Sequence, residues 1–268
     1  MDSVDINMLK SNSNTLRGYM SYSNNNKITL ITLTMNSAKT LADTLNSVHQ
    51  QSYKNIEHLI VDGHSTDSTS QILDEYSRKA NHDIEVFKKN PAGIYNALNY
   101  GIEKASGDVI GVIHSDDYLA DNNCIEMIMN LFNNTTPCVF GDVNIINNQN
   151  KILRTWKDDC QPDLRGYWWT PPHTATYIHK NLYSEYGLYD ESYKISGDYD
   201  FFCRIPRNVI QQFTRIRHTL VIQRNGGIST NPMNFLKKNS EDLRIVKKYS
   251  STPLRDFLIK KYTKINHI

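Results

Sequence analysis

Two adjacent carboxylates end an apolar segment in the middle of the chain. In VIGVIHSDD, the run 109–113 is followed by His114, Ser115, Asp116 and Asp117. A short apolar run bounded by polar residues predicts a buried strand, and successive side chains of a strand point in opposite directions. One acid can therefore hold a hard divalent cation while the other accepts hydrogen bonds from sugar hydroxyls. Taken alone, such a pair also occurs at turns and helix caps.

A second acidic loop follows an earlier apolar run. In IVDGHSTDST, Asp62 leaves the predicted strand, Gly63 permits a tight turn, and Ser65, Thr66 and Asp67 are residue types that cap a following helix. A carboxylate at this position, beside the loop of the first strand, can accept the N–H of a uracil ring. Asp67 is expected to act only as a cap.

The elements that would position these loops alternate along the chain. A β-branched run at 28–34 is followed by cap-forming residues and by Leu41, Leu45 and Val48 at helical spacing. The pattern then repeats, with strands predicted over 56–63, 84–89 and 109–113 and helices over 70–80, 93–105 and near 124–132. Such alternation predicts an α/β fold with a mostly parallel sheet between helices. After Pro137, short segments at 138–146 and 151–156 and an aromatic loop predict a mixed-strand part.

Composition indicates an ordinary globular protein. The 268 residues, 39% of them hydrophobic, can bury one full core. We expect a flexible segment 1–26, a main domain 27–225 and a basic helical appendage 226–268. Neither a membrane-spanning window nor an apolar signal core is visible, so a cytoplasmic location is predicted. The four cysteines lack CxxC spacing, which favours reduced thiols over a zinc site or a disulfide framework.

The net charge of +2 conceals an asymmetry. From Arg204 onward the chain holds 14 Lys and Arg against three acidic residues, so the remainder is acidic. A basic segment on an acidic body predicts an anionic partner or surface, although a solvated helical face is the alternative. The helix predicted from Thr252-Pro253 onward forms an apolar stripe of Leu254, Phe257, Leu258, Tyr262 and Ile265. Its basic residues lie mainly off the stripe: Arg255, Lys260, Lys261 and Lys264.

In combination, six ordered segments resemble the family 2 glycosyltransferases. They read TLTMN, VDGHSTDST, GIYNALNYGI, ASGD, HSDD and ISGDYDFFCRI, and they cover roughly residues 27–205. The branch most similar to this chain assembles bacterial O-antigen, capsule and colanic-acid-type polysaccharides. The resemblance implies the GT-A fold, a nucleotide-sugar donor, Mn²⁺ or Mg²⁺ as cofactor, and an inverting mechanism.

Site roles follow from the resemblance position by position. Asp117 would bind the metal that bridges the donor diphosphate, and Asp198 would be the catalytic base, with Asp200 supporting the site or a helix start. The donor would contact Thr32, Thr34, Asn36, Asp62, Ser65, Asn96 and Asp116. An inverting displacement needs a base within hydrogen-bond reach of the acceptor hydroxyl, and an aspartate is ionised at neutral pH without special tuning. The alternative for Asp198 and Asp200 is that both complement a helix dipole.

The chain departs from the family pattern in three places. Asn96 stands where GIYDAMN has an aspartate, His114 replaces a frequent asparagine, and a single Asp62 replaces a doubled acid. His218 lies where some members add a histidine to the metal, but it receives no role here. These changes leave open a catalytically decayed glycan-binding or scaffold protein. A sugar-phosphate nucleotidyltransferase is more distant, because no GGxGTRL-type loop follows the first strand.

The acceptor side is predicted from an aromatic loop and the basic tail. In GYWWTPPHTATYI, Trp168 and Trp169 can stack on sugar rings and His173 can face the diphosphate or the acceptor, although paired tryptophans also split between core and surface. Asp200 is a further acceptor candidate. The tail helix can lie on an anionic inner leaflet, each basic residue contributing about 1 kcal/mol. The alternative is a plain helix packed on the sheet with its lysines in water.

These features predict an inverting, metal-dependent transferase. It would move a hexose or N-acetylhexosamine from a UDP-sugar to a lipid-linked, polyprenyl-diphosphate-type or growing glycan, at the inner face of the cell membrane. Nucleic acid is not expected as a partner, because the basic residues lack aromatic platforms or a groove-reading helix. The sequence specifies neither the sugar nor the oligomeric state.

Overall fold

The first half of the chain alternates strands and helices as predicted. The computed structural model describes residues 26–133, 135–226 and 234–266, so the predicted flexible segment lies outside it except for Asn26. The order is β1 (Ile28–Thr34), α1 (Leu41–His49), β2 (Ile56–Asp62), α2 (Thr69–Lys79), β3 (Asp83–Lys88), α3 (Ile94–Lys104) and β4 (Val109–Val112). Each bound lies within a residue or so of its prediction, because hydrophobic periodicity reports directly on burial.

The second half is irregular and mixed. It contains β5 (Tyr118–Leu119), α4 (Cys124–Met129), β6 (Cys138–Ile146), β7 (Ile152–Trp156), the 3₁₀ turns Pro162–Leu164 and His173–Ala175, β8 (Thr176–His179) and α5 (Lys180–Tyr186). It continues with α6 (Gly197–Arg204), α7 (Arg207–Ile210), β9 (Thr214–Arg224), α8 (Phe235–Tyr249) and α9 (Pro253–Asn266). The sequence did not predict β9, because its charged and polar residues hide the strand pattern.

A single sheet of nine strands joins the two halves. Its order is β3-β2-β1-β4-β8-β6-β9-β5, with β7 paired to β6. Strands β1 to β4 are parallel, whereas β8 runs antiparallel to both β4 and β6. Since β1 lies between β2 and β4, the carboxyl ends of these three strands meet at one edge, which is where open α/β sheets bind ligands.

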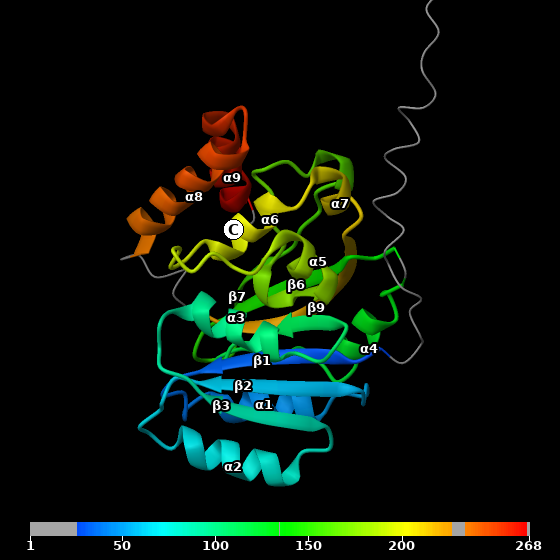
Figure 1. The fold of residues 1–268 in the computed structure, drawn as a ribbon, viewed down its shortest axis with the longest axis vertical. Coiled ribbons are helices and arrows are strands. Elements are labelled where there is room, and N and C mark those ends of the chain that lie inside the picture. Colours follow the sequence, from blue (N-terminus) through cyan, green and yellow to red (C-terminus); the bar gives the residue numbers. More distant parts are fainter. Residues whose placement is uncertain (1–25, 134, 227–233, 267–268) are drawn as a thin grey trace, which may run out of the picture.

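Helices cover both faces of the parallel part of the sheet. Ile31 of β1 packs in one core cluster with Leu98 of α3, whereas Ile60 of β2 packs in another with Leu45 of α1. Figure 1 shows α3 in front of the sheet and α1 behind it. This layering confirms the predicted α/β architecture, a mostly parallel sheet between helices.

The C-terminal helices pack on α6 rather than on the sheet. Figure 1 shows α8 and α9 beside α6, at the opposite end of the molecule from β2 and β3. On α9, Leu254, Leu258 and Tyr262 are 68%, 66% and 66% exposed, while Asp256 and Lys260 are buried. The alternative interpretation, in which the lysines of this helix lie in water, is therefore wrong for Lys260. The side chains of Lys264 and Ile265 lie outside the described residues.

Candidate active site

A cleft of about 600 Å³ opens at the carboxyl ends of β1, β2 and β4. One wall is built by the loops after these strands, and the opposite wall by α6, α8 and α9. Residues that line it include Thr34, Gly63, Asp116 and Asp117 on the strand side, Tyr95 and His173 between the walls, and Asp198, Lys238 and Lys260 on the helical side. The cleft thus brings the acids of HSDD and SGDYD, namely Asp116, Asp117 and Asp198, together with Lys238 and Lys260 of the basic segment.

Asp117 has the environment of a cation ligand. The residue is 1% exposed, and its Oδ1 accepts the backbone N–H of Arg224 at 3.2 Å. Its Oδ2 is buried and has no hydrogen-bond partner among the described residues. Burial, followed by the charge of Asp116, raises the pKa of this carboxyl well above its usual value. A buried carboxylate oxygen without a donor is stabilised by a metal ion, so this site fits a divalent cation.

The loops after β1 and β2 are tied to each other. Asn36 has a φ of 51°, its Oδ1 accepts the N–H of Thr66 at 2.8 Å, and its own N–H donates to Ser65 Oγ at 2.8 Å. The carboxylate of Asp62, which is fully buried, accepts both the N–H and the hydroxyl of Ser65. In this structure Asn36, Asp62 and Ser65 therefore hold the loops that form the cleft wall rather than lining the cleft.

The two threonines of β1 differ in position. Thr34 lines the cleft, and its buried Oγ1 has no partner among the described residues. Thr32 is buried beneath the loop, with Oγ1 at 2.9 Å from Nε2 of His58. Of the predicted donor-binding residues, Thr34 and Asp116 line the cleft, whereas Thr32, Asn36, Asp62, Ser65 and Asn96 are not among its lining residues.

Asn96 faces an acid instead of the cleft. Its Nδ2 donates to Oε2 of Glu191 at 2.8 Å, and Asn99 donates to Oε1 of the same carboxylate at 3.0 Å. An aspartate at position 96 would put a second negative charge against Glu191. The departure from the family motif is therefore matched by a local partner and does not by itself indicate a decayed site.

Asp198 lies in the first turn of α6 and lines the cleft. The hydroxyl of Tyr95 donates to the carbonyl of Ile195 at 2.8 Å and lies 3.3 Å from Oδ1 of Asp198. The imidazoles of His114 and His173, 5.9 Å apart, complete this part of the cleft. Burial lowers the pKa of His114 to about 4 and lowers that of His173, so both rings are neutral at pH 7.

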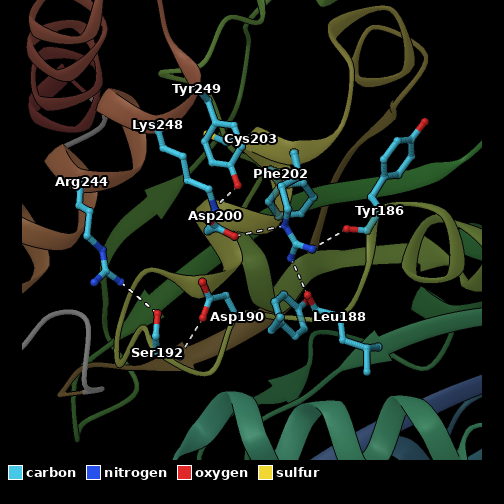
Figure 2. Close-up of polar contacts among 12 residues, drawn as sticks. Tyr186, Leu188, Asp190, Ser192, Asp200, Phe202, Cys203, Arg244, Lys248 and Tyr249 are labelled. Atoms are coloured by element: carbon cyan, nitrogen blue, oxygen red, sulfur yellow. Dashed lines mark hydrogen bonds and ion pairs between the residues drawn. The ribbon is translucent and has the colours of Figure 1, made fainter.

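Asp200 does not reach the cleft. Figure 2 shows its carboxylate beside Lys248 and Tyr249. Oδ2 lies 3.2 Å from Arg204 Nε, and Oδ1 accepts from Tyr249 at 3.1 Å and from Lys248 at 3.4 Å. The structure thus corrects the acceptor role predicted for Asp200, because two residues along a helix place it on another face from Asp198.

The tryptophan pair also lies away from the cleft. Trp169 is 3% exposed, donates its Nε1–H to Asp158 at 2.7 Å and packs edge-on against Phe140. Trp168 packs against the same core cluster. Trp156, at the end of β7, is the tryptophan that lines the cleft. His173, from the same predicted loop as the pair, does lie in the cleft as expected.

Two acids of α8 hold the turn that precedes Asp198. The carboxylate of Glu241 accepts the backbone N–H groups of Lys194, Ile195 and Ser196 at 2.9 to 3.0 Å. Asp242 accepts the hydroxyl of Ser196 at 2.8 Å. The sequence pattern did not predict this role. The signal in the sequence was that the basic tail has only three acids, and the structure shows that all three are buried.

Comparison with known proteins agrees with this geometry. Residues 29–214 match the family model described as "Glycosyl transferase family 2". A "PGL/p-HBAD biosynthesis glycosyltransferase" of Mycobacterium bovis is 27% identical over 219 residues, which cover 78% of this chain and 82% of the relative.

Two solved structures share the fold. S. aureus TarS 1-349 in complex with UDP has a TM-score of 0.63 at 17% identity, covering 86% of this chain and 68% of that one. Mannosyltransferase PcManGT from Pyrobaculum calidifontis, in complex with GDP-Man and Mn²⁺, has a TM-score of 0.62 at 13% identity, covering 95% and 75%.

Proposed function

Because the chain belongs to glycosyl transferase family 2, we propose that its cleft transfers a hexose or N-acetylhexosamine, with inversion, from a nucleotide diphosphate sugar to a glycan acceptor. The observation that supports this proposal is that the buried, unpartnered Asp117 oxygen and the Asp198 carboxylate line one cleft from opposite walls. A donor held between the walls would present its reacting carbon to Asp198.

The strand-side wall would hold the donor. Thr34 Oγ1 offers an unused hydroxyl, and Asp116 can accept hydrogen bonds from ribose or sugar hydroxyls. Asp117 would hold Mn²⁺ or Mg²⁺, whose chemistry is to stabilise the charge that gathers on a departing diphosphate. We propose UDP as the nucleotide, with Asn36, Asp62 and Ser65 shaping the base pocket by holding its loops.

The helical wall would activate the acceptor. Asp198 would accept the proton of the attacking hydroxyl, while the diphosphate leaves from the other side of the sugar carbon. Displacement from the face opposite the leaving group inverts the anomeric centre, so an α-linked donor gives a β-linked product. The nearby Tyr95 hydroxyl keeps Asp198 directed into the cleft.

The acceptor is proposed to be a lipid-linked or growing surface glycan, as in O-antigen-type polysaccharide assembly. Among the described residues no helix is both long and apolar enough to span a bilayer. The exposed Leu254, Leu258 and Tyr262 of α9, together with basic residues nearby, would contact an anionic membrane peripherally. This contact would bring the cleft to a polyprenyl-diphosphate-linked acceptor.

Ligand-dependent melting tests the proposal. A ligand that binds only the folded state raises the melting temperature. We expect UDP with Mn²⁺ to raise the melting temperature, and GDP, CMP and dTDP under the same conditions to leave it unchanged. In Asp117→Asn we expect the part of the UDP-induced increase that requires Mn²⁺ to disappear. A shift with another nucleotide would reassign the donor base. No shift with any nucleotide would favour a decayed site.

A further inference from the structure

The helical wall of the cleft holds a buried positive charge that the donor and base assignments do not use. Lys260, on α9, is 3% exposed and lines the cleft together with Lys238 of α8. Its ammonium lies 3.3 Å from the centroid of the ring of Tyr199, the residue that follows Asp198 in the chain. Burying an ammonium is costly unless an anion or an aromatic face compensates it.

The local acids act on this charge without forming an ion pair with it, since Asp242 and Asp198 raise the pKa of Lys260 only through their Coulombic attraction. Asp242 pairs with Lys261 at 3.1 Å and lies 3.8 Å from Lys238, and it also accepts the hydroxyl of Ser196. Within the described ranges, no carboxylate lies within 4.0 Å of the Lys260 ammonium in an ion pair. The buried Asp242 carboxylate is therefore already shared by the ammonium groups of Lys238 and Lys261, and it acts on Lys260 only at a longer distance. Burial lowers the pKa of Lys260 to about 8, which leaves the ammonium predominant at pH 7.

We propose that Lys238 and Lys260 form an anion subsite for a phosphoryl group of the acceptor, beside the base Asp198. This inference rests on the proposed function and adds a substrate feature to it, namely a phosphate or diphosphate near the accepting hydroxyl. Two lysines that line the cleft supply the charge, and the Tyr199 face keeps the Lys260 ammonium in place.

The position of the subsite favours the acceptor over the donor. Lys238 and Lys260 belong to α8 and α9, which pack beside α6, whereas Asp116 and Asp117 follow β4. Figure 1 shows α8 and α9 on the α6 side of the molecule, away from β2 and β3. The donor diphosphate shares the same phosphoryl chemistry, so the experiment must separate the two sources.

Binding of a short prenyl phosphate tests the subsite. Farnesyl phosphate is titrated into the full chain saturated with UDP and Mn²⁺, and UDP is titrated separately. For Lys260→Met we expect farnesyl phosphate affinity to fall at least about tenfold while UDP affinity changes less than about twofold, since about 1.4 kcal/mol corresponds to tenfold. Lys260→Arg should retain binding. The exposed neighbour change Lys237→Met is the matched control and should bind as the parent does.

Each alternative outcome overturns a distinct statement. A loss of UDP affinity in Lys260→Met would assign the charge to the donor diphosphate. Unchanged farnesyl phosphate affinity in both Lys260→Met and Lys238→Met, with UDP still bound, would remove the subsite and leave the proposed function intact. Absence of UDP binding by the parent would remove the proposed function itself. If Lys260→Met does not fold, Lys238→Met decides, because Lys238 is partly exposed.

Discussion

At the scale of single residues, the position of an aspartate on helix α6 determines whether it lies in the cleft or in the protein interior. Asp198 and Asp200 stand two residues apart in α6, yet one lines the cleft and the other is buried in an ionic cluster. Residues two apart on a helix differ by roughly 200° in direction, so they cannot serve the same surface. Substituting each should therefore affect a different property of the protein.

Asp198→Asn should abolish transfer without weakening donor binding. Loss of a general base lowers a rate by about 10² to 10⁴. The measurement is turnover of the nucleotide sugar that binds, together with the affinity for UDP and Mn²⁺. Asp163→Asn, an exposed acid in a 3₁₀ turn, is the control and should keep full activity. Parent-level turnover in Asp198→Asn would rule out its role as base.

Asp200→Asn should instead lower stability. The carboxylate is 1% exposed and offsets the charges of Arg204 and Lys248. Breaking a buried ion pair lowers the free energy of unfolding by about 3 kcal/mol. Because Arg204 and Lys248 are both partly exposed and solvent screens their charges, we expect a loss no larger than this. Urea unfolding, with the same Asp163→Asn control, measures the difference. An unchanged unfolding midpoint would contradict the structural role of the cluster.

At the scale of elements, α8 positions the turn before the base. Glu241 accepts three successive backbone N–H groups, so a residue of the C-terminal helices fixes the start of α6. The strand side is held differently, by hydrogen bonds between the loops that follow β1 and β2. Each wall of the cleft is thus supported by contacts between segments distant in sequence.

Glu241→Gln should lower both stability and transfer. Hydrogen bonds to a charged acceptor contribute about 1.5 to 3 kcal/mol, and the amide keeps only one oxygen for the three donors. We expect a lower melting temperature and a reduced turnover, with UDP affinity nearly unchanged because the strand-side wall is intact. Glu103→Gln, exposed on α3, is the control. Full turnover combined with a lower melting temperature would mean that the turn does not depend on Glu241.

The β2–α2 layer predicts a pH dependence of stability. His58 is fully buried between Thr32 and Tyr76, and burial lowers its pKa to about 3. Burial also lowers the pKa of His82 to about 4. In the unfolded chain these two histidines bind protons near pH 6.5, whereas in the folded chain they stay neutral at that pH. The free energy of unfolding therefore decreases as pH falls below about 6.5.

Urea unfolding between pH 7.5 and 5 measures whether the free energy of unfolding decreases as pH falls. Each such histidine contributes a slope of about 1.4 kcal/mol per pH unit below its unfolded pKa. The slope should be smaller in His58→Gln than in the parent, since other buried histidines still contribute. A parent profile that is flat over this range would show that the folded state accepts these protons.

At the scale of the whole molecule, the C-terminal helices contribute an inner and an outer surface. Their inner side completes the cleft with Lys238 and Lys260, and their outer side exposes large apolar residues, including Phe235 and Leu236 of α8. Exposed apolar side chains beside basic ones favour an anionic bilayer surface. One segment would then couple membrane contact to acceptor binding.

Vesicle sedimentation tests this coupling. The triple change Leu254→Ser, Leu258→Ser and Tyr262→Ser should reduce binding to phosphatidylserine-containing vesicles by more than tenfold, because it removes exposed apolar area. Turnover with a water-soluble acceptor should be unchanged. Equal binding by parent and variant would exclude α9 as the membrane contact, and high salt should weaken the parent because screening reduces the lysine contribution.

The sequence by itself determined the alternating half of the fold and the acids at its strand ends. Hydrophobic period and cap-forming residues are local properties, so the bounds of β1 and β6 and the position of Asp117 could be predicted from them. Only the tertiary structure decided which residues face the cleft. Trp169 packs in the core, Asn96 donates a hydrogen bond to Glu191, and Lys260 is buried beside Tyr199. These outcomes depend on contacts between distant segments, which no local period records.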